Sequence, residues 1–538
     1  MAPRTPFDRR VLAGIAGMAA VTLLVGGAFA GLLAEAAGNW SGAVAAFDPY
    51  LLRITRFTLW QAVLSTILSV VPAILVARAL ARHPSFTGRS LILRLFALPL
   101  ALPAIVAALG ILALLGRGGF FADWLTALTA TRWQGIYGLS GILVAHVFFN
   151  LPLATRLLLH ALETVPADQW RLAAQLGMGA RASFRLIEWP AMRAALPGVA
   201  GLVFMLCVTS FTVVLTLGGG PRATTLEVAI YQALRFDFDP ARAVALTTLQ
   251  IALTVVIVAV LMRLGANMAG DASLPVAPRR PVDAGWPERL VNGVAIVAAL
   301  GFVAGPIVAI VAAGLKADLA RLAADPAVHK ATITSLVLAL IAALLSVALS
   351  LALTTARRAL ELRRSRLAAP GLLERLFDTG AGFVLVIPPI VIGAGWFVLL
   401  RGTGQVFSAA SAMVVTVNAV MALPFAIRAI RPAYDAASAR HERLCASLGI
   451  AGFARLRLVD WPSIRRPALT ALAFAMALSL GDLGVIALFG SNEVQTLPYL
   501  LLARMGSYRT ADAAGLALFL GALCLLLMLV VDRSRRTG

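Results

Sequence analysis

The sequence predicts an all-α polytopic membrane protein with about twelve transmembrane helices, arranged as two parallel six-helix repeats. Three observations predict this fold class: the composition, a series of long apolar runs, and a loop that occurs twice at a fixed spacing. Hydrophobic residues make up 60% of the 538 and charged residues only 13%, and the mean hydropathy is +0.90. Soluble chains average about 45–50% apolar and about 25% charged residues, so this composition excludes a soluble enzyme of several domains.

The apolar runs define the expected spans. A helix needs about 20 mostly apolar residues to cross a hydrocarbon core about 30 Å thick. Each run that meets this need is expected to form one membrane-spanning helix. The runs cover residues 11–33, 57–80, 92–115, 137–158, 198–217, 243–262, 290–314, 332–355, 380–400, 408–427, 468–490 and 512–531.

The first run is similar to a signal peptide because it follows Arg4, Arg9 and Arg10. It is too long for the apolar part of a signal, and no clear cleavage site follows it. We therefore expect it to be retained as the first helix.

The net charge of +21 has two possible sources. A basic nucleic-acid-binding module would carry its Lys and Arg on a soluble domain, and no such domain is visible. If the N-terminus is cytoplasmic and each run crosses the membrane once, most of the excess positive charge falls in cytoplasmic loops, as the positive-inside rule requires. The charge therefore supports the predicted topology, with both termini in the cytoplasm, and gives no reason to expect nucleic acid as a partner.

A polar break near the middle divides the chain. Residues 264–289 contain four prolines and two adjacent arginines, which is typical of a linker. The predicted organisation is a first repeat at 1–263, a cytoplasmic linker at 264–289, and a second repeat at 290–538.

The two halves share a sequence motif at an offset of 272 residues. Leu172–Gly177 matches Leu444–Gly449, and Ile187–Pro190 matches Val459–Pro462. Further identities at the same offset are Arg171 with Arg443, Arg185 with Arg457, Arg193 with Arg465, Leu151-Pro152 with Leu423-Pro424, and Arg156 with Arg428. Both copies follow an even-numbered span, so the repeat is parallel and its axis lies near the membrane normal.

Each copy of the motif predicts a short helix, a glycine turn and a second helix that returns to the membrane. Residues 166–176 and 438–448 have apolar positions near helical spacing, and Gly177 and Gly449 stand where such helices would end. Trp-Pro follows about twelve residues later and is typical of a helix start. A simple positive-inside loop is the alternative, but charge bias alone requires no fixed spacing of Gly and Trp-Pro. The tryptophans are expected either at the membrane interface or packed against the short helix.

These loops resemble the EAA loop of ABC importer permeases, here at about 159–197 and 430–467. Ala-Ala-x-Leu-Gly in the first copy and Cys-Ala-x-Leu-Gly in the second are each followed, nine residues later, by a hydrophobic residue, one more residue and Trp-Pro. The Glu-Ala pair of the family pattern is replaced by Arg-Leu in both copies. The residues that the resemblance assigns to ATPase coupling are Arg171, Leu172, Ala173, Ala174, Leu176, Gly177, Trp189 and Pro190, and Arg443, Leu444, Cys445, Ala446, Leu448, Gly449, Trp461 and Pro462.

Two such halves in one chain are similar to the ferric-iron and thiamine permeases, and the whole chain most resembles the thiamine transport permeases of Gram-negative bacteria. The stretches that carry this likeness are 141–163, 217–243, 480–488 and 506–509. The resemblance implies a subunit of the bacterial inner membrane that translocates thiamine, or its phosphates, from periplasm to cytoplasm. It also implies two copies of a cytoplasmic ABC ATPase and a periplasmic thiamine-binding protein as partners.

We expect no catalytic, cofactor or metal site in the chain itself. A P-loop requires GxxxxGK[ST], and neither lysine, Lys316 or Lys330, follows such a loop. ATP and Mg would therefore be used by the partner ATPase. The three cysteines have no CxxC spacing, which argues against a zinc site.

Three polar residues inside the spans are candidates for the translocation path. Asp482 is the one carboxylate deep in an apolar run, and intramembrane ionisable residues are functional candidates. Its repeat partner is Ser210, and Asn150 lies on the fourth span. A structural role is open for each: Asp482 and Ser210 could bond the backbone of broken spans, and Asn150 could face the bundle interior or mark a kink before Leu151-Pro152.

Three other functions can be weighed against this one. A ferric-iron or other small-solute ABC importer permease would have the same architecture. An ion-coupled secondary transporter would need a relay of intramembrane acids and bases, of which only Asp482 qualifies, and would leave the repeated loop unexplained. A membrane enzyme would need a cluster of catalytic polar residues, and no such cluster is visible in the sequence.

Overall fold

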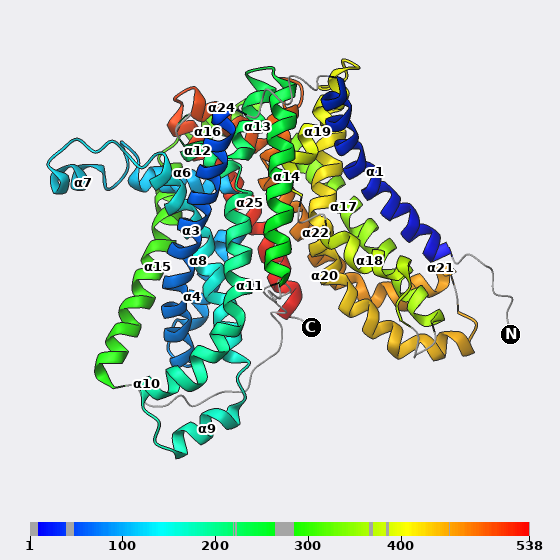
Figure 1. Ribbon diagram of the computed structural model, residues 1–538, viewed down its shortest axis with the longest axis horizontal. Helices are drawn as coiled ribbons and strands as arrows, with labels where there is room; N and C mark the ends of the chain where they lie inside the picture. The colour runs from blue at the N-terminus through cyan, green and yellow to red at the C-terminus, as the bar shows by residue number, and fades with distance from the viewer. Residues whose placement is uncertain are drawn as a thin grey trace.

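The protein is helical throughout the part that the computed structural model describes. The described residues are 9–38, 48–218, 220, 223–263, 285–364, 369–383, 387–450 and 452–536, and every regular element among them is a helix. Figure 1 shows the helices as long, roughly aligned rods, as expected for a chain whose backbone must satisfy its hydrogen bonds within lipid. The predicted fold class is confirmed.

The first half alternates long helices with short ones. Its elements are α1 (Arg9–Gly38), α3 (Pro49–Arg82), α4 (Arg89–Leu95), α5 (Leu98–Ala101), α6 (Ala104–Leu115), α7 (Ala122–Thr129), α8 (Leu139–Glu163), α9 (Ala167–Gln175), α10 (Ala180–Ser183), the π-helix η1 (Phe184–Glu188), α11 (Trp189–Val208), α12 (Thr212–Leu217), α13 (Leu226–Arg235) and α14 (Pro240–Arg263).

The second half repeats this order with some helices fused. Its elements are α15 (Trp286–Leu315), α16 (Leu319–Ala324), α17 (Pro326–Arg363), α18 (Leu372–Phe383), α19 (Pro389–Arg401), α20 (Ala410–Ser447), α21 (Gly452–Arg455), the π-helix η4 (Leu456–Asp460), α22 (Trp461–Gly481), α23 (Gly484–Phe489), α24 (Leu497–Gly506) and α25 (Thr510–Arg536). Most of the predicted linker, residues 264–284, lies outside the described residues.

Nine helices in the described residues are long and apolar enough to cross a membrane. A tenth would be the pair Arg89–Ala101 and Ala104–Leu115, which is bent by 112°. The remaining predicted spans, 380–400 and 468–490, coincide with the 13-residue α19 and with α22 followed by α23. The chain is therefore a multi-pass membrane protein, and the number twelve stays a prediction.

The first long helix of each half packs against the other half. α1 lies along α17 and α19, and α15 lies along α3 and α6; Figure 1 shows α1 and α15 on opposite flanks of the molecule. The sequence did not predict this exchange, because the apolar residues of a helix do not specify which neighbouring helix they contact.

Small residues permit the crossing of α1 and α19. A Cβ atom built on Gly395 would overlap the backbone carbonyl oxygen of Ala28, and one built on Gly31 would overlap the carbonyl oxygen of Gly395. At this crossing the Trp396 indole N–H donates a hydrogen bond of 2.7 Å to the backbone oxygen of Leu24. Lipid supplies no hydrophobic drive between helices, so such close backbone approach is a main source of attraction.

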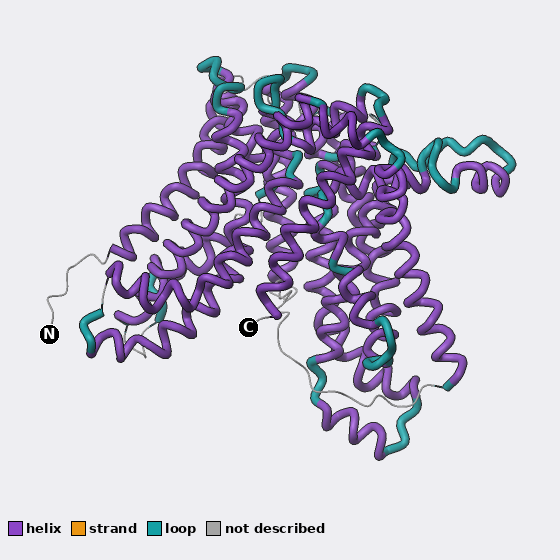
Figure 2. The backbone as a smooth tube through the Cα atoms, turned by 180° about the vertical axis from the view of Figure 1, so that it is seen from behind, coloured by secondary structure: helices purple, strands orange, loops and turns teal. Residues whose placement is uncertain are grey.

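The helices converge toward one face and diverge toward the other into two groups (Figures 1 and 2). One group contains α3, α8, α11 and α15, and the other contains α17, α18 and α20. The two repeated loops lie at the diverging ends, with α9 and α10 on one group and α21 on the other. The repeat thus places its two copies of the motif on the same face of the molecule.

The crossing of α1 and α19 predicts the effect of Gly395→Ala. The added methyl group has no room against the backbone of Ala28, and overpacking of this kind costs about 1–3 kcal/mol. We expect a lower Tm for the detergent-solubilised protein. Gly26→Ala, on the partner helix α1 but with nothing within 4 Å of the new atom, is the control and should leave Tm unchanged. Equal Tm values for both variants would contradict the close crossing.

Candidate functional site

The glycine turn predicted in the first loop is present. Gly177 has φ +61°, a left-handed conformation that glycine adopts without strain. Its N–H donates to the oxygen of Ala174 at 3.1 Å, and the N–H of Met178 donates to the oxygen of Ala173 at 3.0 Å. This bonding closes the end of α9 as a Schellman motif. Nothing lies within 4 Å of a Cβ at Gly177, so the backbone angle alone requires glycine here.

The second loop ends in the same way at Gly449. Its φ is +64°, its N–H donates to the oxygen of Ala446 at 3.4 Å, and the N–H of Ile450 donates to the oxygen of Cys445 at 2.9 Å. The two loops therefore share their turn as well as their sequence.

The second loop differs from the prediction in one respect. Residues 438–448 do not form a separate short helix, because α20 runs without a break through Ala410–Ser447. In the first copy α8 ends at Glu163 and α9 begins after Pro166. Proline disfavours helical geometry in the residue before it. The equivalent residue in the second copy is Ser438, which permits the helix to continue.

Each loop also contains one π-helical turn directly before Trp-Pro. The N–H of Trp189 donates to the oxygen of Phe184, and that of Trp461 to the oxygen of Leu456, five residues back in each case. The ring of the following proline would clash with the carbonyl oxygen four residues earlier in an α-helix, and the wider turn avoids this clash. Isolated π turns are frequent at functional sites.

The last turns of α9 and of α20, before the two glycine turns, present apolar side chains to solvent. Leu172 and Leu176 are 56% and 68% exposed, and Leu444 and Leu448 are 56% and 63% exposed. The opposite side of each helix is buried, through Ala173 and Cys445. The other predicted coupling residues, Arg171, Ala174, Trp189, Pro190, Arg443, Ala446, Trp461 and Pro462, are all exposed. Each loop therefore offers two leucines beside an arginine as a surface on which a partner could dock.

Two buried carboxylates in the loops were missed by the sequence analysis. Glu188 and Asp460 end the two π turns and are only 2% and 3% exposed. Their common position at the offset of 272, as acids within basic loops, is the signal that could have identified them.

The predicted translocation residues Ser210 and Asp482 both lie at helix breaks. α11 ends at Val208 and α12 begins at Thr212, while α22 ends at Gly481 and α23 begins at Gly484. Asp482 Oδ1 accepts a hydrogen bond of 3.2 Å from the N–H of Gly484. This contact gives the carboxylate a structural function at the break.

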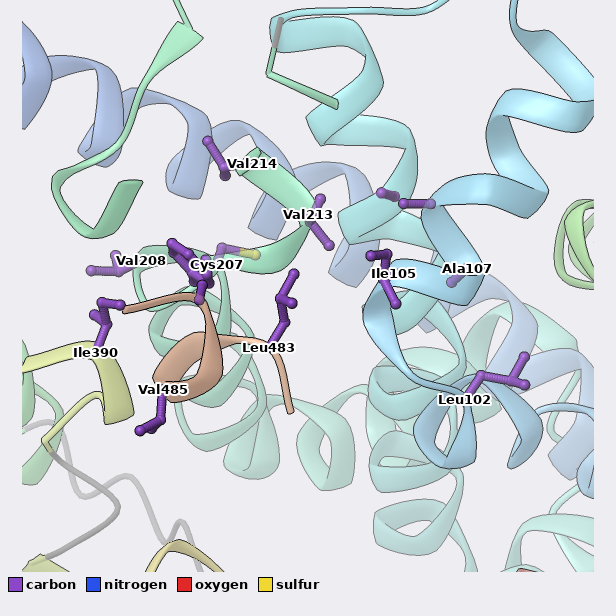
Figure 3. Close-up of a cluster of buried hydrophobic side chains, with 14 of the residues drawn as sticks. Leu102, Ile105, Ala107, Cys207, Val208, Val213, Val214, Ile390, Leu483 and Val485 are labelled. Carbon is purple, nitrogen blue, oxygen red and sulfur yellow. The ribbon is translucent and has the colours of Figure 1, made fainter. Parts of the chain in front are cut away.

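Four breaks from the two halves meet in the centre of the molecule. A Cβ on Gly481 would lie 3.3 Å from Pro103, the residue that separates α5 from α6. A Cβ on Gly484 would lie 3.9 Å from Pro389, at the start of α19, and 4.0 Å from Phe211. Figure 3 shows buried side chains from all four segments gathered there, including Leu102, Val208, Ile390 and Leu483.

Asn150 lies in the interior of the first half rather than at these breaks. Its Nδ2 donates to Cys207 Sγ at 3.3 Å, which joins α8 to α11, and the residue is 3% exposed. In the second half Asn418 Nδ2 donates to Ser479 Oγ at 2.9 Å, and Ser479 stands 272 residues after Cys207. The structure therefore brings Ser210 and Asp482 to the central breaks and places Asn150 in a helix–helix contact.

A membrane bundle of two parallel repeats, each with one copy of the same loop on the same face, is typical of a two-repeat transport permease. The chain belongs to the family of binding-protein-dependent transport system inner membrane components, which matches residues 70–269 and 365–537. The two matched segments contain the two repeated loops.

Individual relatives match almost the whole chain. The thiamine transport system permease protein ThiP of Brucella abortus is 58% identical over 532 residues, covering 98% of this chain and 96% of the relative. The protein of the same name from Escherichia coli is 43% identical and covers 96% of each chain. The one from Haemophilus influenzae is 36% identical, with 98% of this chain and 96% of the relative covered.

The turn geometry predicts that Gly177→Ala loosens the first loop. A left-handed conformation costs an L-residue about 1–2 kcal/mol, so the end of α9 should open more often. Limited trypsin digestion after Arg181 and Arg185 should then be faster. Gly179→Ala is the control, because Gly179 has φ −69° and nothing within 4 Å of its Cβ position. Equal digestion rates for the two variants would refute the role of the turn.

Proposed function

We propose that this chain is the membrane permease of an ATP-binding cassette importer that carries thiamine, or its phosphates, from the periplasm to the cytoplasm. The observation that carries the proposal is full-length similarity, at 58%, 43% and 36% identity, to proteins named as thiamine transport permeases. A common fold alone would not indicate a substrate. Similarity across both halves includes the surfaces that line the centre.

The two loops support docking of one ATPase subunit each. Both carry the same left-handed glycine, the same two exposed leucines and the same arginine, so two copies of one ATPase could bind them in equivalent ways. ATP and Mg would be bound and used by these partners, and the permease would have no ATPase site of its own. The loops then face the cytoplasm, as do both termini, in a bacterial inner membrane.

The central breaks would act as the point of closure on the path. Leu102, Val208, Ile390 and Leu483 are all less than 10% exposed and belong to one cluster of buried side chains at these breaks (Figure 3). A periplasmic thiamine-binding protein would deliver substrate at the converging face. Movement of the two loops toward each other, driven by closure of the ATPase pair, would change the packing at these breaks and open the path.

The substrate is tested by uptake of labelled thiamine in cells that lack other thiamine carriers. Deletion of this gene should abolish uptake, and its return on a plasmid should restore it. Uptake of ferric iron by the same cells is the control and should not change. Normal thiamine uptake after the deletion would refute the substrate while leaving the family unchanged.

Asp482 provides a test of how the path handles a cation. Asp482→Asn keeps an oxygen that can accept from the N–H of Gly484, and we expect thiamine uptake to be largely retained. Asp482→Ala leaves that buried N–H unpaired at a cost of about 1–3 kcal/mol and should reduce the amount of folded permease. Loss of uptake in Asp482→Asn, at normal amounts of protein, would instead assign the carboxylate an ionic role on the path.

A further inference from the structure

We propose that the first coupling loop is joined by ion pairs to α15, the first helix of the second half, and that Glu188 and Glu288 are positioning residues that transmit the movement of this loop across the joint that these ion pairs form. The proposal rests on the proposed function, since it concerns how ATPase movement reaches the path. Its general basis is that coupling between sites passes through packed and hydrogen-bonded elements.

The joint of the first loop begins at Glu188, the last residue of η1. Its carboxylate accepts hydrogen bonds from Arg78 Nε at 2.8 Å and from Arg82 Nε at 2.7 Å. Both arginines lie on α3, one helical turn apart. Charge-assisted bonds at such distances are about twice as strong as neutral ones, and burial of Glu188 shields them from water.

The same two arginines continue the joint to the second half. Arg78 Nη2 donates to Glu288 Oε1 at 2.6 Å, and Arg82 is paired with the same carboxylate oxygen. Glu288 lies in the first turn of α15. Two arginines are therefore held between two carboxylates, one from the loop of the first half and one from the first helix of the second half.

Two further contacts fix the loop to α3. Arg82 Nη2 donates to the backbone oxygen of Ala180 at 3.0 Å. The guanidinium of Arg78 lies 5.0 Å from the ring centre of Phe184, and Phe184 packs on Trp189 with ring centres 6.1 Å apart. The joint thus holds the whole turn between α10 and the start of α11.

The buried charges of the second loop are arranged differently, with one arginine between two carboxylates. Arg455 donates to both carboxylate oxygens of Glu442, at 3.0 and 2.5 Å, and its Nε lies 3.6 Å from Asp460 Oδ1. Burial raises the pKa of Asp460, and the positive charges of Arg455 and Arg10 oppose that rise. Arg10 belongs to the first turns of α1, so α1 brings a cation to this loop where α15 brings an anion to the other.

This arrangement of ion pairs would transmit movement from the loop to the helix, rather than only hold the two together. The N-terminal end of α15 lies at the first loop, and its Glu288 pairs with the two arginines of α3 that also hold Glu188. When an ATPase moves the first loop, α15 must move with it or lose its ion pairs. Movement of the first loop would then reach both halves.

The first joint is tested in the complete complex, with the ATPase and binding protein, reconstituted in liposomes. Glu288→Gln removes the distant carboxylate and leaves the bond between Glu188 and the arginines. We expect ATPase activity stimulated by the loaded binding protein to continue, while thiamine transported per ATP falls by at least about fivefold, the lower range of allosteric coupling. Glu288→Asp should restore much of the ratio.

Glu361→Gln is the matched control. It removes the pair between Arg358 Nη1 and Glu361 Oε2, 2.9 Å long, which lies within α17 and outside both coupling loops. This variant should keep the normal ratio. A normal ratio in Glu288→Gln, or a loss of ATPase activity in parallel with transport, would overturn the proposal and leave the ion pairs a purely structural role.

A distance measurement separates this proposal from the identity of the substrate. Spin labels placed at Arg185→Cys, which is exposed on η1, and at Trp286→Cys, which is 75% exposed at the start of α15, report across the joint. The three native cysteines are buried. The distance should stay constant between the nucleotide-free and vanadate-trapped complex, and should change on trapping once Glu288→Gln is added. A change in the unmodified complex would refute the joint, whereas a complex that moves as expected but carries no thiamine would refute only the substrate.

Discussion

The structure depends on one constraint, which is that a backbone within lipid must bond its own N–H and C=O groups. Unbroken helices satisfy this constraint by themselves, and the helices on the two flanks, α1 and α15, each run for 30 residues. Breaks are tolerated only where protein surrounds them. Here they meet in the centre, at Pro103, Ser210, Pro388 and Asp482, so the same rule that closes the outer wall confines the irregular backbone to the position where a path can open and close.

The two repeats satisfy the same backbone and helix-packing requirements with different side chains. Asp482 accepts a hydrogen bond from the next helix start at its break, and the equivalent position carries Ser210. The contact between the fourth and fifth long helices uses Asn150 with Cys207 in one half and Asn418 with Ser479 in the other. Cys207 and Ser479 stand at equivalent positions of the two repeats, whereas Asn418 is equivalent to His146, one helical turn before Asn150. The repeats therefore keep the contact between the helices but change the side chains that make it.

Sequence alone could predict the features that depend on local chemistry. Gly177 and Gly449 were identified because a left-handed turn favours glycine, and a broken span at Asp482 was one of the two roles that the sequence left open for this carboxylate. The packing of α1 and α15 on the opposite halves could not be predicted, since it depends on which small residues meet in space, such as Gly31 with Gly395. The ion pairs of Glu188 were missed for the same reason, because Arg78 is more than a hundred residues away in the chain.

The unbroken course of α20 has a mechanical consequence. At about 1.5 Å per residue, its 38 residues form a rod about 57 Å long that leads from the membrane interior to the turn at Gly449. In the first half, residues 164–166 separate α8 from α9. Rotation about their backbone torsion angles can change the angle between these two helices. A force applied at the first loop can be absorbed in part by rotation about these torsion angles. The second loop is joined to its long helix without a break, and the points where that helix can bend are Pro424 and Pro432 within it. Two copies of one ATPase bound to the two loops would therefore meet different mechanical stiffness.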